Sequence, residues 1–146
     1  RATHENLLAV YVMDLDGYKP DNDQHGHDVG DELLVAVARR LQCHLRQSDV
    51  IARLGGDEFV VMTGELQSTT QAHELGLKLL EAFSSPFALG GIQVQVGLTI
   101  GYAIAPIDSQ DGAGLIKLAD AAMYSGKQSG KFCVRRNTGD LALSSA

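Results

Sequence analysis

Short apolar runs alternate along the chain with longer segments of helical period. The run from Leu7 to Met13, LLAVYVM, is nearly all apolar and ends in the polar segment Asp14–Gly17. A run of this length predicts a strand that is covered on both faces and stops at a loop. Between residues 29 and 45, apolar side chains recur every three or four positions, which predicts a helix with Leu33 and Val37 on its buried face.

The middle of the chain predicts a β-hairpin followed by a helix. Val50–Leu54 and Phe59–Met62 are rich in residues that favour strands, and they flank Gly55-Gly56-Asp57-Glu58. Glycine supplies the positive φ that such a turn needs. Ser68 and Gln71 then form a capping box, which predicts the start of a second helix.

The last part of the chain predicts a second hairpin over residues 87–96, a strand at 98–104, a helix after Asp111 and a strand at 132–134. The whole order is then β-α-β-β-α-β-β-β-α-β, which contains the β-α-β-β-α-β series of the ferredoxin-like fold. We therefore expect an α+β domain in which helices pack on an antiparallel sheet.

Composition and charge exclude several classes of protein. With 146 residues, 45% of them hydrophobic and 21% charged, the chain is long enough for one domain with a core. Its net charge of −6 argues against a nucleic-acid partner, because a polyanion would be repelled. Cys43 and Cys133 lack zinc-site spacing and are predicted to be buried free thiols. No apolar run approaches the roughly 18 residues of a membrane span. We expect a cytoplasmic domain, which is compatible with a membrane anchor elsewhere in a longer protein.

Two pairs of acidic residues are the candidates for a functional site. Asp14 and Asp16 follow the first strand, and Asp57 and Glu58 occupy the first hairpin turn. If these strands are neighbours, the pairs face each other, and crowded carboxylates repel unless a cation neutralises them. Such oxygen ligands suit Mg²⁺, and two ions about 3.5–4 Å apart can assist an in-line phosphoryl transfer. The alternative is that all four acids are solvated turn residues.

Several short segments recur in a characteristic order around the first hairpin. Residues 55–59 spell Gly-Gly-Asp-Glu-Phe, the GGDEF motif, preceded by Arg53. The other segments are Asp14-Leu15-Asp16, Asn22-Asp23, Gly26-His27-x-x-Gly30-Asp31 and Ala119-Asp120-Ala121-Ala122-Met123-Tyr124. In their order and spacing the chain resembles the diguanylate cyclase family over residues 7–134. The resemblance implies the palm-type sheet of nucleotidyl cyclases. It also implies a GGDEF domain over residues 1–136 that lacks the family's usual N-terminal segment, with 137–146 as a tail or linker.

The resemblance implies a Mg²⁺ (or Mn²⁺) site and a catalytic role for the hairpin acids. Asp14, the Leu15 carbonyl, Asp57 and Glu58 would hold the metal, and Asp57 would also help to deprotonate the ribose 3′-OH. A homodimer would join two GTP molecules into cyclic di-GMP and release two pyrophosphates. Each 3′-OH would attack the α-phosphate of the other GTP.

The resemblance also implies how the base of GTP is recognised. Asn22 and Asp31 would bind the guanine edge, because an amide donates and accepts while a carboxylate accepts two N–H bonds. His27 would lie near the base, with bracing of the loop before the helix as the alternative.

The phosphates would be held by a loop and by two lysines. Backbone amides from Leu15 to Tyr18, Gly17 among them, would cradle phosphate oxygens. Lys127 and Lys131 match residues that bind the terminal phosphates, and Lys131 replaces the usual arginine. The alternative is two solvated lysines near a helix end.

Arg46 and Asp49 match the family's R-x-x-D inhibitory site, which implies feedback inhibition by cyclic di-GMP. Two other functions stay open. One is a catalytically weak, GTP-sensing domain attached to an EAL phosphodiesterase. Gly17 and Asp21, which depart from the family pattern, favour it, and the segments Pro86–Leu89 and Ala121–Tyr124 resemble versions fused to an EAL domain. The other is a cyclic di-GMP receptor that uses Arg46 and Asp49. A fused sensor or EAL domain is the expected partner in a longer protein.

Overall fold

The computed structural model describes residues 6–17 and 26–136, leaving aside the side chains of 26–29. The elements in chain order are β1 (Leu7–Asp16), α1 (Gly26–Cys43), β2 (Val50–Gly55), β3 (Glu58–Leu66), α2 (Thr69–Glu81), the short 3₁₀ helix η2 (Ala82–Ser84), β4 (Phe87–Leu89), β5 (Ile92–Val94), β6 (Gly97–Ala105), α3 (Gly112–Gln128) and β7 (Val134–Arg136). This order confirms the predicted succession of strands and helices, and the fold is α+β.

The main sheet has five strands in the order β2-β3-β1-β6-β7, with the first strand of the chain at its centre. All neighbours are antiparallel except β6 and β7, which run parallel. The expectation of an antiparallel sheet is therefore wrong at this edge, because α3 crosses over between β6 and β7 and returns the chain in the same direction.

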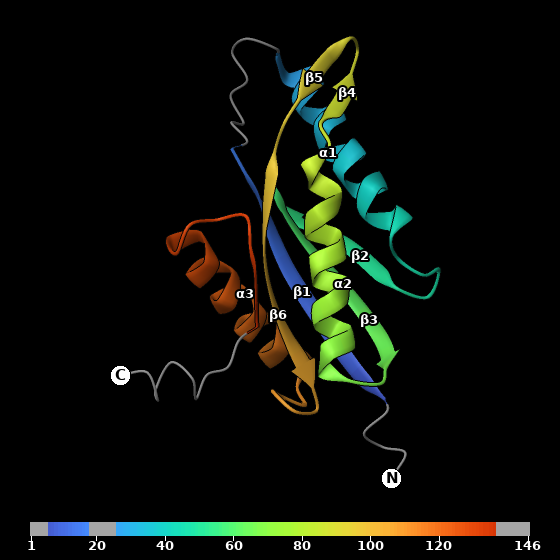
Figure 1. Cartoon of the computed structure of the whole chain (residues 1–146), viewed down its shortest axis with the longest axis vertical. Coiled ribbons are helices and arrows are strands. Elements are labelled where there is room, and N and C mark those ends of the chain that lie inside the picture. The colour runs from blue at the N-terminus through green and yellow to red at the C-terminus, as the bar shows by residue number, and fades with distance from the viewer. Residues whose placement is uncertain (1–5, 18–25, 137–146) are drawn as a thin grey trace.

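Helices cover both faces of the sheet (Figure 1). Alternation along β1 divides its side chains between the two faces. Val10 and Val12 pack in a cluster with residues of α3, while Tyr11 and Met13 belong to the larger core with residues of α1 and α2. A strand buried on both sides explains why residues 7–13 are apolar almost without a break.

Helix α3 lies directly against β6 at Gly101. A Cβ atom at this position would fall 2.1 Å from the Met123 backbone nitrogen and 2.2 Å from the Ala119 carbonyl oxygen. Only glycine allows this approach. The close packing holds the C-terminal half of α3, which carries Lys127, against the sheet.

The second hairpin, β4 and β5, forms a separate two-stranded sheet. Arg40 of α1 packs against the start of this hairpin, since its guanidinium carbon lies 3.6 Å from the centroid of the Phe87 ring. The same guanidinium donates hydrogen bonds to the carbonyls of Ala82 (3.0 Å) and Pro86 (2.9 Å). These contacts hold α1 at a fixed angle to the rest of the domain.

Two local predictions need correction. The last strand begins at Val134 rather than at residue 132, because Lys131 and Phe132 have positive φ values of 65° and 47° and are not extended. The cysteines are not buried: Cys43 is exposed and Cys133 is partly exposed. Across the described parts of the chain, no helix combines the length and hydrophobicity needed to cross a membrane.

Candidate active site

The end of β1 and the first hairpin turn form one acidic centre. Asp14 pairs with Glu58 in the β1–β3 register, and the Leu15 amide donates a 3.3 Å hydrogen bond to the Asp57 carbonyl. The side chains of Asp14 and Asp57 are close enough to share a hydrogen bond when one of them is protonated. The prediction that acids from these neighbouring strands lie close together is confirmed for Asp14, Asp57 and Glu58.

Asp14 is the most perturbed acid of this centre. Burial raises its pKa to about 7, the hydrogen bond and charge of Asp57 act in the same direction, and Lys127 opposes them. Its Oδ1 atom is buried, and no N–H or O–H group of the described residues reaches it. A buried carboxylate oxygen without a donor is costly. This carboxylate therefore suits a bound cation.

Glu58 lies beside a fourth acid, Asp120 of α3. Burial raises the pKa of Glu58, and a hydrogen bond to Asp120 and the charge of that residue act in the same direction. Both residues line a hollow of about 300 Å³ with Leu54 and Lys117. The sequence alone assigns Asp120 no role, although this residue lies in the family segment Ala119–Tyr124.

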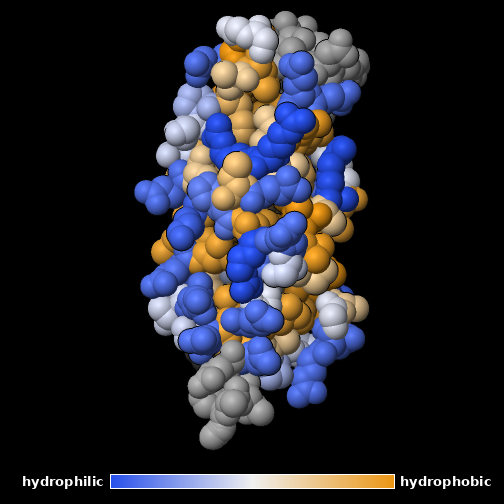
Figure 2. Space-filling model, turned by 90° about the vertical axis from the view of Figure 1, so that its right-hand side faces the viewer, coloured by the Kyte–Doolittle hydropathy of each residue, from blue (hydrophilic) through white to orange (hydrophobic). Residues whose placement is uncertain are grey.

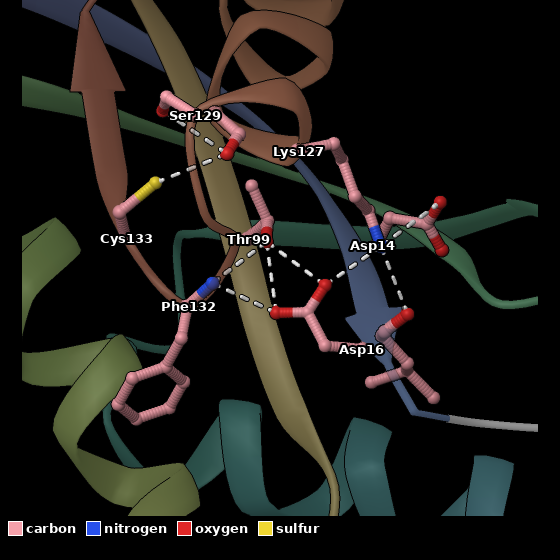
Figure 3. A network of polar contacts seen from close by, with 9 residues as sticks. Asp14, Asp16, Thr99, Lys127, Ser129, Phe132 and Cys133 are labelled. Atoms are coloured by element: carbon pink, nitrogen blue, oxygen red, sulfur yellow. Dashed lines mark hydrogen bonds and ion pairs between the residues drawn. The ribbon is translucent and has the colours of Figure 1, made fainter.

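Asp16 turns away from the hairpin and joins a different network (Figure 3). Its carboxylate accepts hydrogen bonds from the Thr99 hydroxyl (2.8 and 2.9 Å), the Phe132 amide (2.9 Å) and the Lys127 ammonium (2.7 Å). The expectation that Asp16 faces the hairpin acids is therefore wrong. β1 lies between β3 and β6, and Asp16 is directed to the β6 side.

The two predicted phosphate-binding lysines occupy different environments. Lys127 is about one-fifth exposed and donates to the Leu15 carbonyl (3.0 Å) as well as to Asp16. Its ammonium also lies 3.8 Å from Asp14 Oδ2. Lys131 is exposed in the turn after α3, where its amide donates to the Gly126 carbonyl (2.9 Å).

Only part of the predicted nucleotide-binding set can be placed. Gly17 is exposed at the end of β1 with φ of 82°, a value that favours glycine. Asp31 is exposed on α1 and lines a pocket of about 410 Å³, whose walls include Leu34, Ile51 and Phe59. Tyr18, Asn22 and the side chain of His27 lie outside the described residues.

The pocket beside Asp31 opens on the side of the molecule that carries α1 and the β2 edge. Figure 2 shows that hydrophobic surface lies between polar side chains on this side. Val35, which lines the pocket, is about half exposed. Mostly apolar walls with polar groups from Asp31, Gln42 and Arg53 suit a flat, partly polar ligand such as a purine.

The predicted inhibitory pair lies apart from the acidic centre. Arg46 contacts Asp49 (3.3 Å) and also donates to the Thr63 hydroxyl (2.9 Å) and the Gly64 carbonyl (2.5 Å). The Arg46 side chain is about half exposed, while the Asp49 side chain is almost fully buried. These contacts tie the loop before β2 to the end of β3.

The residues at the acidic centre fit a divalent metal of the magnesium type. Within residues 6–17 and 26–136, no three His, Cys, Asp or Glu side chains converge as a complete metal site. The donors present are two carboxylates, from Asp14 and Asp57, and the Leu15 carbonyl. Mg²⁺ is commonly held by one or two carboxylates together with waters and substrate phosphates, so an incomplete protein shell is what this metal requires.

Comparison with known proteins identifies the family. The family model "Diguanylate cyclase, GGDEF domain" matches residues 1–133. The chain belongs to the GGDEF family of diguanylate cyclases. It is 44% identical over 127 residues to the bifunctional diguanylate cyclase/cyclic di-GMP phosphodiesterase MucR of Pseudomonas aeruginosa, covering 87% of this chain and 18% of MucR.

Two further relatives from Pseudomonas aeruginosa are named for opposite activities. Diguanylate cyclase TpbB is 40% identical over 126 residues, covering 86% of this chain and 29% of TpbB. Cyclic di-GMP phosphodiesterase NbdA is 39% identical over 124 residues, covering 85% of this chain and 16% of NbdA. The chain thus spans less than a third of each of these relatives.

A solved structure agrees with the fold. The crystal structure of the TpbB GGDEF domain superposes with a TM-score of 0.86 at 38% identity, covering 92% of this chain and 84% of that chain. The family is one of cyclic di-GMP signalling and typically uses Mg²⁺.

Proposed function

We propose that this domain is a diguanylate cyclase that condenses two GTP molecules into cyclic di-GMP, with Mg²⁺ as its cofactor. The observation that carries the proposal is the buried Asp14 oxygen without a donor, next to Asp57 and the Leu15 carbonyl. Three oxygen ligands of this kind, beside Lys127 of α3, match a site for a metal-bound triphosphate.

Asp14, the Leu15 carbonyl and Asp57 would hold the metal, and Glu58 would complete the acidic shell. The metal would neutralise charge on the phosphate oxygens. Asp57 lies in a hairpin turn and is partly exposed, so its carboxylate can approach the ribose 3′-OH and accept its proton. Attack at the α-phosphate of a second GTP forms the new P–O bond and releases pyrophosphate.

Guanine would occupy the pocket between α1 and β2. Asp31 at the rim would accept two N–H bonds from the base, and Leu34 and Phe59 would contact its faces. Asn22, His27, Gly17 and Tyr18 complete the proposed nucleotide set, and Lys127 and Lys131 would bind the terminal phosphates. Because one domain binds one GTP, two domains must face each other as a homodimer.

Product identification tests this proposal. The protein is incubated with GTP and Mg²⁺, and the nucleotides are separated by chromatography and identified by mass spectrometry. We expect cyclic di-GMP with two pyrophosphates per product, and a specific activity that rises with protein concentration as dimers form. A linear product or no product at any concentration contradicts the cyclase assignment.

A GTP-sensing role is the second candidate, and the relative NbdA favours it, since NbdA is named as a phosphodiesterase alone. In that case GTP would bind to the same residues without turnover and would alter the activity of an attached domain. Saturable GTP binding with Mg²⁺ but without pyrophosphate release would favour the sensor over the cyclase.

A further inference from the structure

The ammonium of Lys127 occupies the position of a cation at the proposed metal site. Its Nζ atom lies 3.0 Å from the Leu15 carbonyl oxygen and 3.8 Å from Asp14 Oδ2. Both oxygens belong to the proposed metal shell. The third neighbour, Asp16, lies 2.7 Å away and is outside that shell.

If the ammonium and a divalent ion both contacted these oxygens, the two positive charges would repel each other. A metal on the Leu15 carbonyl and Asp14 would lie within a few ångströms of Nζ, where two positive charges repel strongly in a partly buried site. Lysine has a flexible stem and a point charge, so it can move away. Asp16 keeps it nearby, because this carboxylate is itself fixed by Thr99 and the Phe132 amide.

We infer that Lys127 is an internal stand-in for the metal, held on the Leu15 carbonyl and Asp14 until a divalent ion displaces it. Displacement leaves the ammonium paired with Asp16 and turned toward the incoming triphosphate. Metal binding and the release of the phosphate-binding lysine are then one event. This inference rests on the metal site of the proposed function.

The inference predicts that loss of the lysine charge strengthens metal binding. Mn²⁺ is titrated into the nucleotide-free protein, and free Mn²⁺ is measured by electron paramagnetic resonance. Lys127→Met and Lys127→Gln are expected to bind Mn²⁺ about tenfold more tightly than wild type, since a repelling charge has been removed. Lys127→Arg keeps the charge and is expected to stay near wild type.

Lys78→Met is the matched control, because it removes the same charge from an exposed position on α2. Its Mn²⁺ affinity is expected to be unchanged. Circular dichroism spectra confirm that each variant is folded, and Lys127→Gln, whose amide can still donate to the Leu15 carbonyl, replaces Lys127→Met if the latter unfolds.

The outcomes separate this inference from the proposed function. If wild type binds Mn²⁺ at the acidic centre but neutral variants at position 127 bind it no more tightly, the stand-in role is overturned and the metal site is retained. If wild type binds no Mn²⁺, and Asp14→Asn and Asp57→Ala behave like wild type, the metal site itself is overturned. Equal tightening by Lys78→Met would show a general charge effect and also overturns the inference.

Discussion

The amide of Leu15 donates a 3.3 Å hydrogen bond to the carbonyl of Asp57, which joins the end of β1 to the GGDEF turn. This bond is made by backbone atoms, so it survives substitution of either side chain. It fixes the distance between the Leu15 carbonyl and the hairpin acids. The geometry of the proposed metal shell thus depends on the main chain, and its chemistry depends on the carboxylates.

Asp57→Ala should abolish synthesis and leave the fold intact. The substitution removes one proposed metal ligand and the proposed base, so we expect the rate of cyclic di-GMP formation to fall by roughly 10²–10³ or more. The midpoint of thermal unfolding should not fall, because the variant removes an acid that repels Asp14. Glu74→Ala, an exposed position on α2, is the control. A variant with the wild-type rate would rule out this role for Asp57.

Asp16→Ala should destabilise the domain, although Asp16 is not a proposed metal ligand. The variant leaves Lys127, Thr99 and the Phe132 amide without their shared acceptor in a mostly buried position. We expect a loss of roughly 2–4 kcal/mol in the free energy of unfolding. Urea denaturation measures it.

Asp31→Ala is the comparison for this measurement, because it removes an exposed carboxylate and should change stability by less than about 1 kcal/mol. If both variants unfold at the same urea concentration, the network around Asp16 contributes little to stability.

The sequence predicts the elements of this fold well and their side-chain neighbours poorly. The apolar run at 7–13 predicts a doubly covered strand, and the glycines at 55 and 56 predict a turn, because both depend on local physics. The partners of Asp16 could not be predicted, since Thr99 and Lys127 are more than 80 positions away in sequence. Which neighbour Asp16 contacts depends on strand order and on where α3 crosses over, and neither is a local property.

The stability of the metal-free protein should fall as the pH rises from about 5 to 8. Burial raises the pKa of Asp14 from 3.8 to about 7, so between these two pH values the folded state keeps a proton that the unfolded state has lost. Stability falls with pH where the folded state binds more protons. Mg²⁺ needs the ionised form. The rise in the unfolding midpoint on adding Mg²⁺ should therefore be larger at pH 8 than at pH 6.

Asp14→Asn isolates this effect from the titration of other groups. The amide does not ionise, so the variant should lose less stability than wild type between pH 5 and 8 and should gain little from Mg²⁺ at either pH. Thermal unfolding curves with and without Mg²⁺ measure both the pH dependence of stability and the stabilisation by Mg²⁺. A pH dependence that is the same in wild type and variant would assign the effect to other residues.

Arg46→Ala should have two separable effects, one on stability and one on the proposed product inhibition. The guanidinium donates to Thr63 and Gly64 in addition to contacting Asp49, so its removal frees the loop before β2 from the end of β3. We expect a loss of about 1–2 kcal/mol in the free energy of unfolding. If Arg46 also binds cyclic di-GMP, added product should no longer slow synthesis.

Thr63→Val distinguishes the two effects, because it removes one acceptor of Arg46 and leaves the guanidinium in place. The Thr63 side chain is buried, so valine fills nearly the same volume. This variant should lose stability but should be inhibited at the same or a lower cyclic di-GMP concentration than wild type, since the guanidinium is freer to meet the product. Initial rates measured over a series of cyclic di-GMP concentrations show how strongly the product inhibits each variant. If Thr63→Val loses inhibition as completely as Arg46→Ala, Arg46 acts by supporting the fold and not by binding the product.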